Sequence, residues 1–333
     1  MTILQRHILI ASTALLFFVA LCVPQRAAAQ SEPQLSQYWA VPAYYNPAAT
    51  GTSDFVRIRG AAKLQWLGIE NAPKTFLGAA DSPFRIGSKR IGAGVNFSQQ
   101  GIGLFSNLQF NIQASYKLRI FKGTLSIGVQ GGYYNSKFKG SEIYIPDDDD
   151  YHQSGDTSLP SQDLTGNAFD FSAGLHYTHK YFSVGASVLH ILEPTVKLNI
   201  DGSGTSDTHE YETSLPRMAY FTFDSNIPIK NTLFEVQPSL LVRTDFASFG
   251  AEITARARFN KFISFGVGYR WKEAAIAMLA AEYRNFFLGY AFDYPLSAIN
   301  KASSGSHEII AGYSLKLDFS GKNKNKHRSI RIM

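Results

Sequence analysis

Three consecutive residues, Ser306, His307 and Glu308, carry the side-chain types that a hydrolase uses in a nucleophilic relay. The alternating residues that follow place them at the start of a β-strand, where successive side chains point to opposite faces. Ser306 and Glu308 therefore point away from His307, and no proton relay can form. We expect His307 and Glu308 to fix the loop before this strand, and we expect that the chain is not an enzyme.

The stretch "PDDDDYH" (146–152) is the other group of residues that could do chemistry, and Asp156 and Asp163 follow it. Its oxygen-rich composition suits calcium, but the spaced acids and central glycine of an EF-hand loop are absent. We interpret Asp147–Asp150 as a solvated loop, with calcium binding as the alternative. The sequence has no glycine-rich phosphate loop, no His-Glu-x-x-His and no coherent ligand cluster, so we predict no cofactor and no metal.

The N-terminus has the pattern of a secretory signal peptide, residues 1–29. A basic start precedes an apolar run over Ile8–Val23, and Ala27–Ala29 gives a cleavage site near Gln30. A lipoprotein signal using Cys22 is the weaker alternative, because Leu21 stands where a small residue is required. Cys22 is the only cysteine. The mature chain is therefore expected to have neither disulfides nor a thiolate metal site.

The positive charge of this sequence is local. The whole chain carries +6, but removing the signal peptide and the basic tail 320–333 leaves −1 for residues 30–319. The high basicity of the chain therefore does not indicate a basic face that would bind nucleic acid. The tail is either a disordered, solvated end or a docking segment for an acidic partner.

The segment "NLQFNIQASYKLRI" (107–120) alternates without exception between polar and apolar residues, which indicates a β-strand with one apolar face. Further strands with this character are predicted along the chain, most of them longer than the usual ~5–6 residues. A tilted strand needs about 9–11 residues to cross a bilayer. The fourteen predicted strands span 55–67, 74–83, 90–99, 107–120, 123–137, 167–178, 181–191, 217–228, 232–244, 247–259, 262–272, 274–284, 286–294 and 307–319.

The connections between these strands alternate in length. Tight turns follow even-numbered strands, whereas the long connections 138–166, 192–216 and 295–306 follow odd-numbered ones. Outer-membrane barrels have this asymmetry, with short periplasmic turns and long extracellular loops. We therefore predict an all-β fold: an antiparallel transmembrane outer-membrane β-barrel of about 14 strands over residues 55–319, with both chain ends in the periplasm.

In such a barrel the apolar face meets lipid and the polar face lines the lumen. An Arg or Lys on the lipid face costs about 2–4 kcal/mol near the midplane, so charged residues should point inward. For 107–120 we expect Phe110 and Ile112 in lipid and Gln109 and Gln113 inside. We also expect Asp318 to pair with Arg57 or Arg59 and close the seam. The predicted lumenal charges are Arg57, Arg59, Lys63, Lys117, Arg119, Glu252, Arg256, Arg258, Lys316 and Asp318.

The segment 30–54 precedes the first strand. Pro42, Pro47 and the Asn46-Pro47 turn exclude a strand here, and the many aromatic residues exclude a free linker. We interpret it as a plug-like segment packed into the periplasmic mouth of the barrel. The alternative is a contact site for periplasmic components.

Three stretches resemble the PorP/SprF proteins of the type IX secretion system. They are "QLSQYWAVPAYYNPAATG" (34–51), "LQWLGIENAPKT" (64–75) and "FDYPLSAINKASSGSHEIIAGYSLKL" (292–317). The first stretch departs slightly from the family pattern, because Asn46-Pro47 is followed by Ala-Ala-Thr-Gly where a small residue and Gly are expected. The matching positions, either structural or partner-contacting, are Gln37, Tyr38, Asn46, Pro47, Gln65, Trp66, Gly68, Pro73, Asp293, Tyr294, Ser306, His307 and Glu308.

The resemblance implies a partner role in the outer membrane of Bacteroidetes. The protein would belong to the type IX secretion or gliding machinery and assist export or surface anchoring of an adhesin. Its partners would be membrane lipid, secretion components and a secreted surface protein, with no nucleic acid and no small-molecule substrate. The alternative is a porin or a transporter of hydrophobic solutes. The lumen distinguishes the two, because a porin needs an open polar channel.

Overall fold

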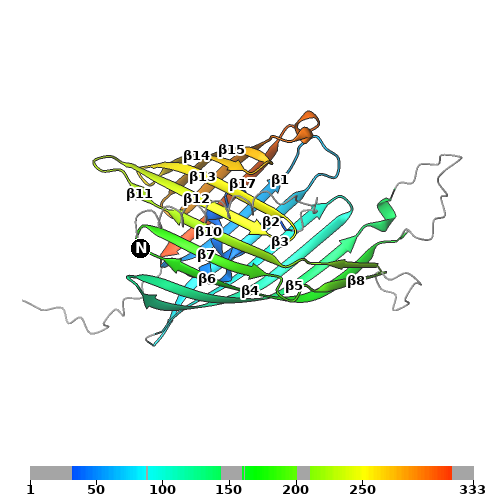
Figure 1. The fold of residues 1–333 in the computed structure, drawn as a ribbon, viewed down its shortest axis with the longest axis horizontal. Coiled ribbons are helices and arrows are strands. Elements are labelled where there is room, and N and C mark those ends of the chain that lie inside the picture. Colours follow the sequence, from blue (N-terminus) through cyan, green and yellow to red (C-terminus); the bar gives the residue numbers. More distant parts are fainter. Residues whose placement is uncertain (1–31, 88, 144–159, 161, 201–210, 317–333) are drawn as a thin grey trace, which may run out of the picture.

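The computed structural model describes residues 32–87, 89–143, 160, 162–200 and 211–316, which form a closed antiparallel β-barrel (Figure 1). Strand β1 closes on β17, with Phe55 opposite Lys316 and Leu64 opposite His307. The fourteen wall strands are β1 (Phe55–Leu64), β2 (Lys74–Ile86), β3 (Lys89–Ile102), β4 (Phe105–Ile120), β5 (Gly123–Phe138), β6 (Leu164–Thr178), β7 (Phe182–Leu189), β10 (Met218–Ser225), β12 (Phe234–Thr244), β13 (Phe249–Phe259), β14 (Ile263–Arg270), β15 (Ala274–Tyr283), β16 (Phe286–Pro295) and β17 (Ser306–Lys316).

The predicted barrel and its fourteen wall strands are confirmed, with three differences. The predicted loop 192–216 contains a hairpin, β8 (Thr195–Ile200) and β9 (Tyr211–Ser214), and a short β11 (Ile227–Pro228) follows β10. The alternating Val196 and Leu198 of β8 are buried with Leu164, which explains why this loop forms strands. The first strand ends at Leu64 rather than Leu67, because the next two residues turn back.

The faces of β4 follow the prediction. Phe110 and Ile112 are 42% and 61% exposed on the outer face, where lipid lies, whereas Gln109 and Gln113 are buried in the lumen. The same period-two pattern of burial recurs in β13 and β15. An apolar outer face and a polar interior are the reverse of a soluble sandwich, as a membrane barrel requires.

The connections divide by length between the two ends of the barrel. Tight turns contain residue pairs such as Phe121-Lys122 and Asn260-Lys261, which have positive φ at both residues, the conformation that suits a tight hairpin. The long connections 139–163, 190–217 and 296–305 lie at the opposite end. In the orientation of outer-membrane barrels, the short-turn end is periplasmic and the long-loop end extracellular.

The described helices are short: η1 (Tyr38–Ala40), α2 (Pro42–Tyr45), η2 (Pro47–Ala49), η3 (Gly140–Glu142) and η4 (Ala298–Lys301). None of them has the length and apolar character needed to cross a membrane. The first three belong to residues 32–54, which we call the plug.

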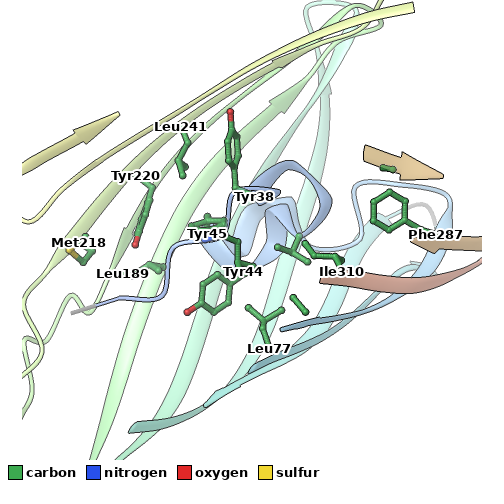
Figure 2. Packing of buried hydrophobic residues seen from close by; sticks show 14 residues of the cluster. Tyr38, Tyr44, Tyr45, Leu77, Leu189, Met218, Tyr220, Leu241, Phe287 and Ile310 are labelled. Atoms are coloured by element: carbon green, nitrogen blue, oxygen red, sulfur yellow. The ribbon is translucent and has the colours of Figure 1, made fainter. Parts of the chain in front are cut away.

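The plug lies inside the barrel and forms an apolar core there. Leu35, Tyr38, Val41, Tyr44 and Tyr45 are buried in one cluster with inward-facing wall side chains. Figure 2 shows the three tyrosines among wall residues that include Leu77, Leu189, Tyr220, Leu241 and Ile310. The plug extends beyond the periplasmic mouth at which we expected it, because Ser36 reaches the extracellular ends of β1 and β16.

Wall glycines give the plug backbone room to approach. A Cβ on Gly128 of β5 would overlap the backbone nitrogen of Ala48, and one on Gly92 of β3 would overlap the carbonyl of Thr50. Gly131, also on β5, has no atom within 4 Å of a Cβ position. These close contacts fix how deeply the plug sits in the lumen.

We predict that Gly128→Val displaces the plug, because overpacking costs about 1–3 kcal/mol and falls on the plug contact. Gly131→Val is the matched control on the same strand. A thiol placed at Ala43, which is buried, reports plug seating through its rate of maleimide labelling. Labelling should accelerate in Gly128→Val and stay slow in Gly131→Val. Equal rates in the two variants would contradict this packing.

Candidate functional site

Five ionisable side chains from five strands meet in the extracellular half of the lumen. We call them the lumenal charge cluster: Lys63 (β1), Glu252 (β13), Arg270 (β14), Asp293 (β16) and Glu308 (β17). All five are buried. The alternation of each strand turns the side chain away from lipid, and closure of β1 on β17 brings the two chain ends together.

Within this cluster every charge has an opposite partner. The Lys63 ammonium lies 2.8 Å from Asp293 Oδ2 and 3.4 Å from Glu308 Oε2. The Arg270 guanidinium lies 2.7 Å from Glu252 Oε2 and 3.0 Å from Asp293 Oδ2. Three carboxylates face two cations, so the wall alone leaves one negative charge unbalanced. Further donors are needed to satisfy it.

The plug supplies these donors at Ser36 and Gln37. Their backbone N–H groups donate to the two oxygens of Glu308 over 2.6 and 2.8 Å. The Ser36 hydroxyl donates to Asp293 over 2.6 Å and accepts from both Lys63 and Arg270 over 2.8 Å. Ser36 thus contacts three members of the cluster with one oxygen. The plug and the wall complete a single buried network.

A second contact holds the start of the plug. His190, which follows β7, places Nε2 2.6 Å from Glu32 and Nδ1 2.9 Å from Asp170. Burial by itself lowers the pKa of His190, but the Glu32 and Asp170 carboxylates outweigh it and raise that pKa to about 10. The imidazolium is therefore the favoured form. The protonated His190 stabilises the folded protein fully below pH ~6.5, and this stabilisation is lost as the pH rises through about 10.

The other end of the plug is held by hydrogen bonds of the Asn46 amide and of the Asp81 carboxylate. The Asn46 side chain accepts from Ala48 N and donates to the carbonyl of Leu175, so it caps η2 and ties it to β6. Gly51 N donates to Asp81 over 2.7 Å, and the same carboxylate pairs with Arg57 at 2.8 Å. The Asn46-Pro47 motif thus has a structural role at the turn before the barrel begins.

The stretch 64–75 packs against the loop that precedes β17. Trp66 N donates to the Ser306 hydroxyl over 3.1 Å, and Leu67 exchanges backbone hydrogen bonds of 2.8 and 2.7 Å with Gly305 and Ser304. Gln65 N donates to the carbonyl of Pro73, which closes the loop on itself, and Trp66 turns back with a φ of 48°. Gly68 and Gly305 have φ values of 102° and 99°, where a side chain would be strained. Because Ser36 also reaches Asp293, parts of all three family-like stretches meet at the extracellular end.

Ser306, His307 and Glu308 lie as their alternation predicts. Ser306 and Glu308 are buried in the lumen, whereas His307 faces outward and bonds the Tyr290 hydroxyl at 2.7 Å. Tyr290 and Tyr294 are both exposed on the outer surface. The three neighbours form no relay.

The remaining predicted lumenal charges have varied surroundings. Arg256 stacks on the plug residue Trp39 at 3.6 Å, and Arg258 pairs with Glu282 at 2.6 Å. Arg59 donates to Ser314 over 3.1 Å. The other three that the structure describes lie toward the short-turn end: Lys117 is half-buried, and Arg119 and Lys316 are exposed.

The predicted seam pair between Asp318 and Arg57 or Arg59 cannot be placed, since Asp318 lies outside the described residues. Arg57 pairs with Asp81 on the neighbouring β2. The cleavage site near Gln30, the acidic stretch Asp147–Asp150 and the tail 320–333 also lie outside the described residues. Among those that are described, no group of three or more His, Cys, Asp or Glu side chains is placed to hold a metal ion.

Several members of the site were not singled out from sequence. Ser36 lies inside the first family-like stretch, but it was not selected there, unlike its neighbours Gln37 and Tyr38. Arg270 and Asp170 lie on the lumenal faces of β14 and β6, yet their partners follow only from the closed fold. Glu32 lies in the plug, which has no repeating pattern. His190 falls in the predicted strand 181–191 but lies beyond the end of β7, where alternation no longer determines which way a side chain points.

A protein-family model described as "Type IX secretion system membrane protein PorP/SprF" matches residues 27–313. Comparison with curated proteins gives no match. Among solved structures, the Ralstonia pickettii toluene transporter TbuX is similar at 12% identity and a TM-score of 0.48, over 83% of this chain and 93% of that one. The Acinetobacter baumannii outer membrane protein Omp33 is similar at 7% identity and a TM-score of 0.43, over 79% and 98% of the two chains. A Pseudomonas aeruginosa FadL homologue has 8% identity and a TM-score of 0.43, over 83% and 94%.

We predict that Glu308→Gln lowers the free energy of unfolding by about 3–5 kcal/mol, because it removes one partner from a buried charge network. Glu142→Gln is the control. It breaks the exposed pair with Lys139 and should cost no more than about 1 kcal/mol. Urea unfolding of the detergent-solubilised protein, followed by tryptophan fluorescence, measures both. Similar small losses in the two variants would show that the cluster does not hold the plug.

Proposed function

Because this chain belongs to the PorP/SprF family of type IX secretion system membrane proteins, we propose that it acts in the outer membrane as a binding partner for an exported surface protein. In this proposal the barrel holds an adhesin at the cell surface or assists its export, together with other secretion components. The signal peptide is removed near Gln30, and the mature protein works by binding rather than by catalysis.

The observation that carries the proposal is the plug. The lumen that a solute would use is occupied by a buried aromatic core, and the lumenal charge cluster ties this core to five strands. Removing the plug would take one hydrogen-bond donor from Asp293 and two from Glu308. A barrel built this way suits a rigid anchor better than an open channel.

The extracellular end offers surfaces for a partner. The hairpin β8–β9 extends from β6 above the shorter β7, and it has its own small core of Leu164, Val196, Leu198 and Leu215. The loop 65–73 is tied to Ser304 and Gly305 by backbone hydrogen bonds. Both extensions are held by the fold and stand where an exported protein would arrive, which supports binding through the loops.

Deletion of 195–214, which holds the β8–β9 hairpin, should abolish capture of the surface protein from native membranes while leaving the barrel folded. The reason is that the hairpin adds to the extracellular surface but is no part of the closed wall. Affinity purification followed by mass spectrometry measures the outcome, with Gly131→Val as a fully folded control. Capture of the same proteins by the deletion variant would contradict binding through this hairpin.

The purified wild-type protein should show no large steady openings in planar bilayers, because the plug fills its lumen. A variant lacking residues 34–50 should conduct, and it shows that the assay detects an open barrel of this size. Steady wild-type conductance comparable to that of the plugless variant would favour the alternative of a porin or a transporter of hydrophobic solutes.

A further inference from the structure

A row of like charges crosses three neighbouring strands at the periplasmic end of the barrel. The register places Arg85 of β2 directly opposite Arg90 of β3, and Arg90 directly opposite Lys117 of β4. Adjacent strands are about 4.8 Å apart, so the three side chains start within about 10 Å of one another. Like charges directly opposite each other destabilise a sheet. An anionic ligand would offset this repulsion.

The residues that the structure describes supply little compensation. None of Arg85, Arg90 and Lys117 forms an ion pair with another residue that the structure describes, and the same is true of the nearby Lys316. Asp54 is the one acidic residue among the described residues that line the space they share. Asp81, on the same face of β2, is already bound to Arg57 and to Gly51 N.

These four cations line a cavity of about 330 Å³ together with Thr52, Ser53 and Asp54 from the end of the plug. Alternation along β2, β3 and β4 turns Arg85, Arg90 and Lys117 into the lumen, as it does Gln113 and Ser115. They therefore face away from lipid headgroups. The plug closes the lumen above them, because Thr50 packs directly on Gly92. Because the cavity lies at the periplasmic end, a ligand would reach it from the periplasm.

We propose that this cavity binds an acidic segment of a periplasmic protein. Carboxylates on alternate residues of an extended chain are about 7 Å apart, so two of them fit within the roughly 10 Å that the cationic row spans. A small inorganic anion would reach only one or two of the cations and leave the remainder unpaired. The proposal concerns the periplasmic mouth and is independent of the extracellular role proposed above.

The test uses the full-length mature protein in detergent and a fluorescein-labelled hexa-aspartate peptide, with hexa-asparagine as the neutral control. Fluorescence anisotropy should show that hexa-aspartate alone binds and that added salt weakens binding. Arg90→Gln should raise the Kd for hexa-aspartate roughly tenfold, because it removes one charge-assisted hydrogen bond to the peptide. Lys89→Gln removes the same charge from the adjacent position on the opposite face of β3, and it should leave the Kd unchanged.

The free proteins give a second readout. Without peptide, Arg90→Gln should unfold at a higher temperature than wild type, because it relieves the repulsion in the row, whereas Lys89→Gln should not. Equal peptide affinity in the two variants, or a lower unfolding temperature for Arg90→Gln, would overturn the proposal. Full displacement of the peptide by inorganic phosphate at the peptide's own concentration would instead assign the cavity to a small anion and overturn the peptide assignment.

Discussion

Charged side chains that cannot face lipid must be neutralised inside the barrel, and the rest of this structure follows from that constraint. The lumenal charge cluster meets it with two cations, three carboxylates and the donors of Ser36 and Gln37. Breaking such a buried pair costs far more than breaking an exposed one, because the remaining charge stays desolvated. The plug is consequently part of the wall's electrostatics, rather than an independent segment resting in a pore.

The barrel also has a core of an unusual kind. Its outer surface is apolar, so the hydrophobic effect of water does not hold the wall strands together from outside. Inside, the plug tyrosines and leucine pack with Leu77, Leu241 and Ile310 into a cluster like that of a soluble domain. Glycines such as Gly128 let the plug backbone approach the strands closely. Charge and packing act together, since the network fixes one end of the plug and the aromatic core fills the middle.

The two ends of the lumen differ in how they treat charge. At the extracellular end every member of the cluster is paired and buried, which suits a rigid base for binding surfaces. At the periplasmic end Arg85, Arg90 and Lys117 stand opposite one another without compensation from the described residues. Such repulsion lowers the stability of the free protein, and a ligand that neutralises the charges relieves it. The relief of repulsion then adds to the free energy of binding. The plug separates these two environments.

The sequence by itself determined the wall. Period-two alternation such as that of 107–120, strand length and the alternation of short and long connections specify a barrel, because lipid imposes one rule on every strand. Alternation likewise predicted that Lys63 and Glu252 face inward and that Glu308 points away from His307. Only the tertiary structure decided which inward charges meet, since closure brings Lys63 to Glu308 across 245 positions of sequence. The tertiary structure also placed Ser36 among these charges and paired Asp81 with Arg57. The plug has no repeating sequence pattern, so its path depends on the space and the hydrogen-bond partners inside the closed wall.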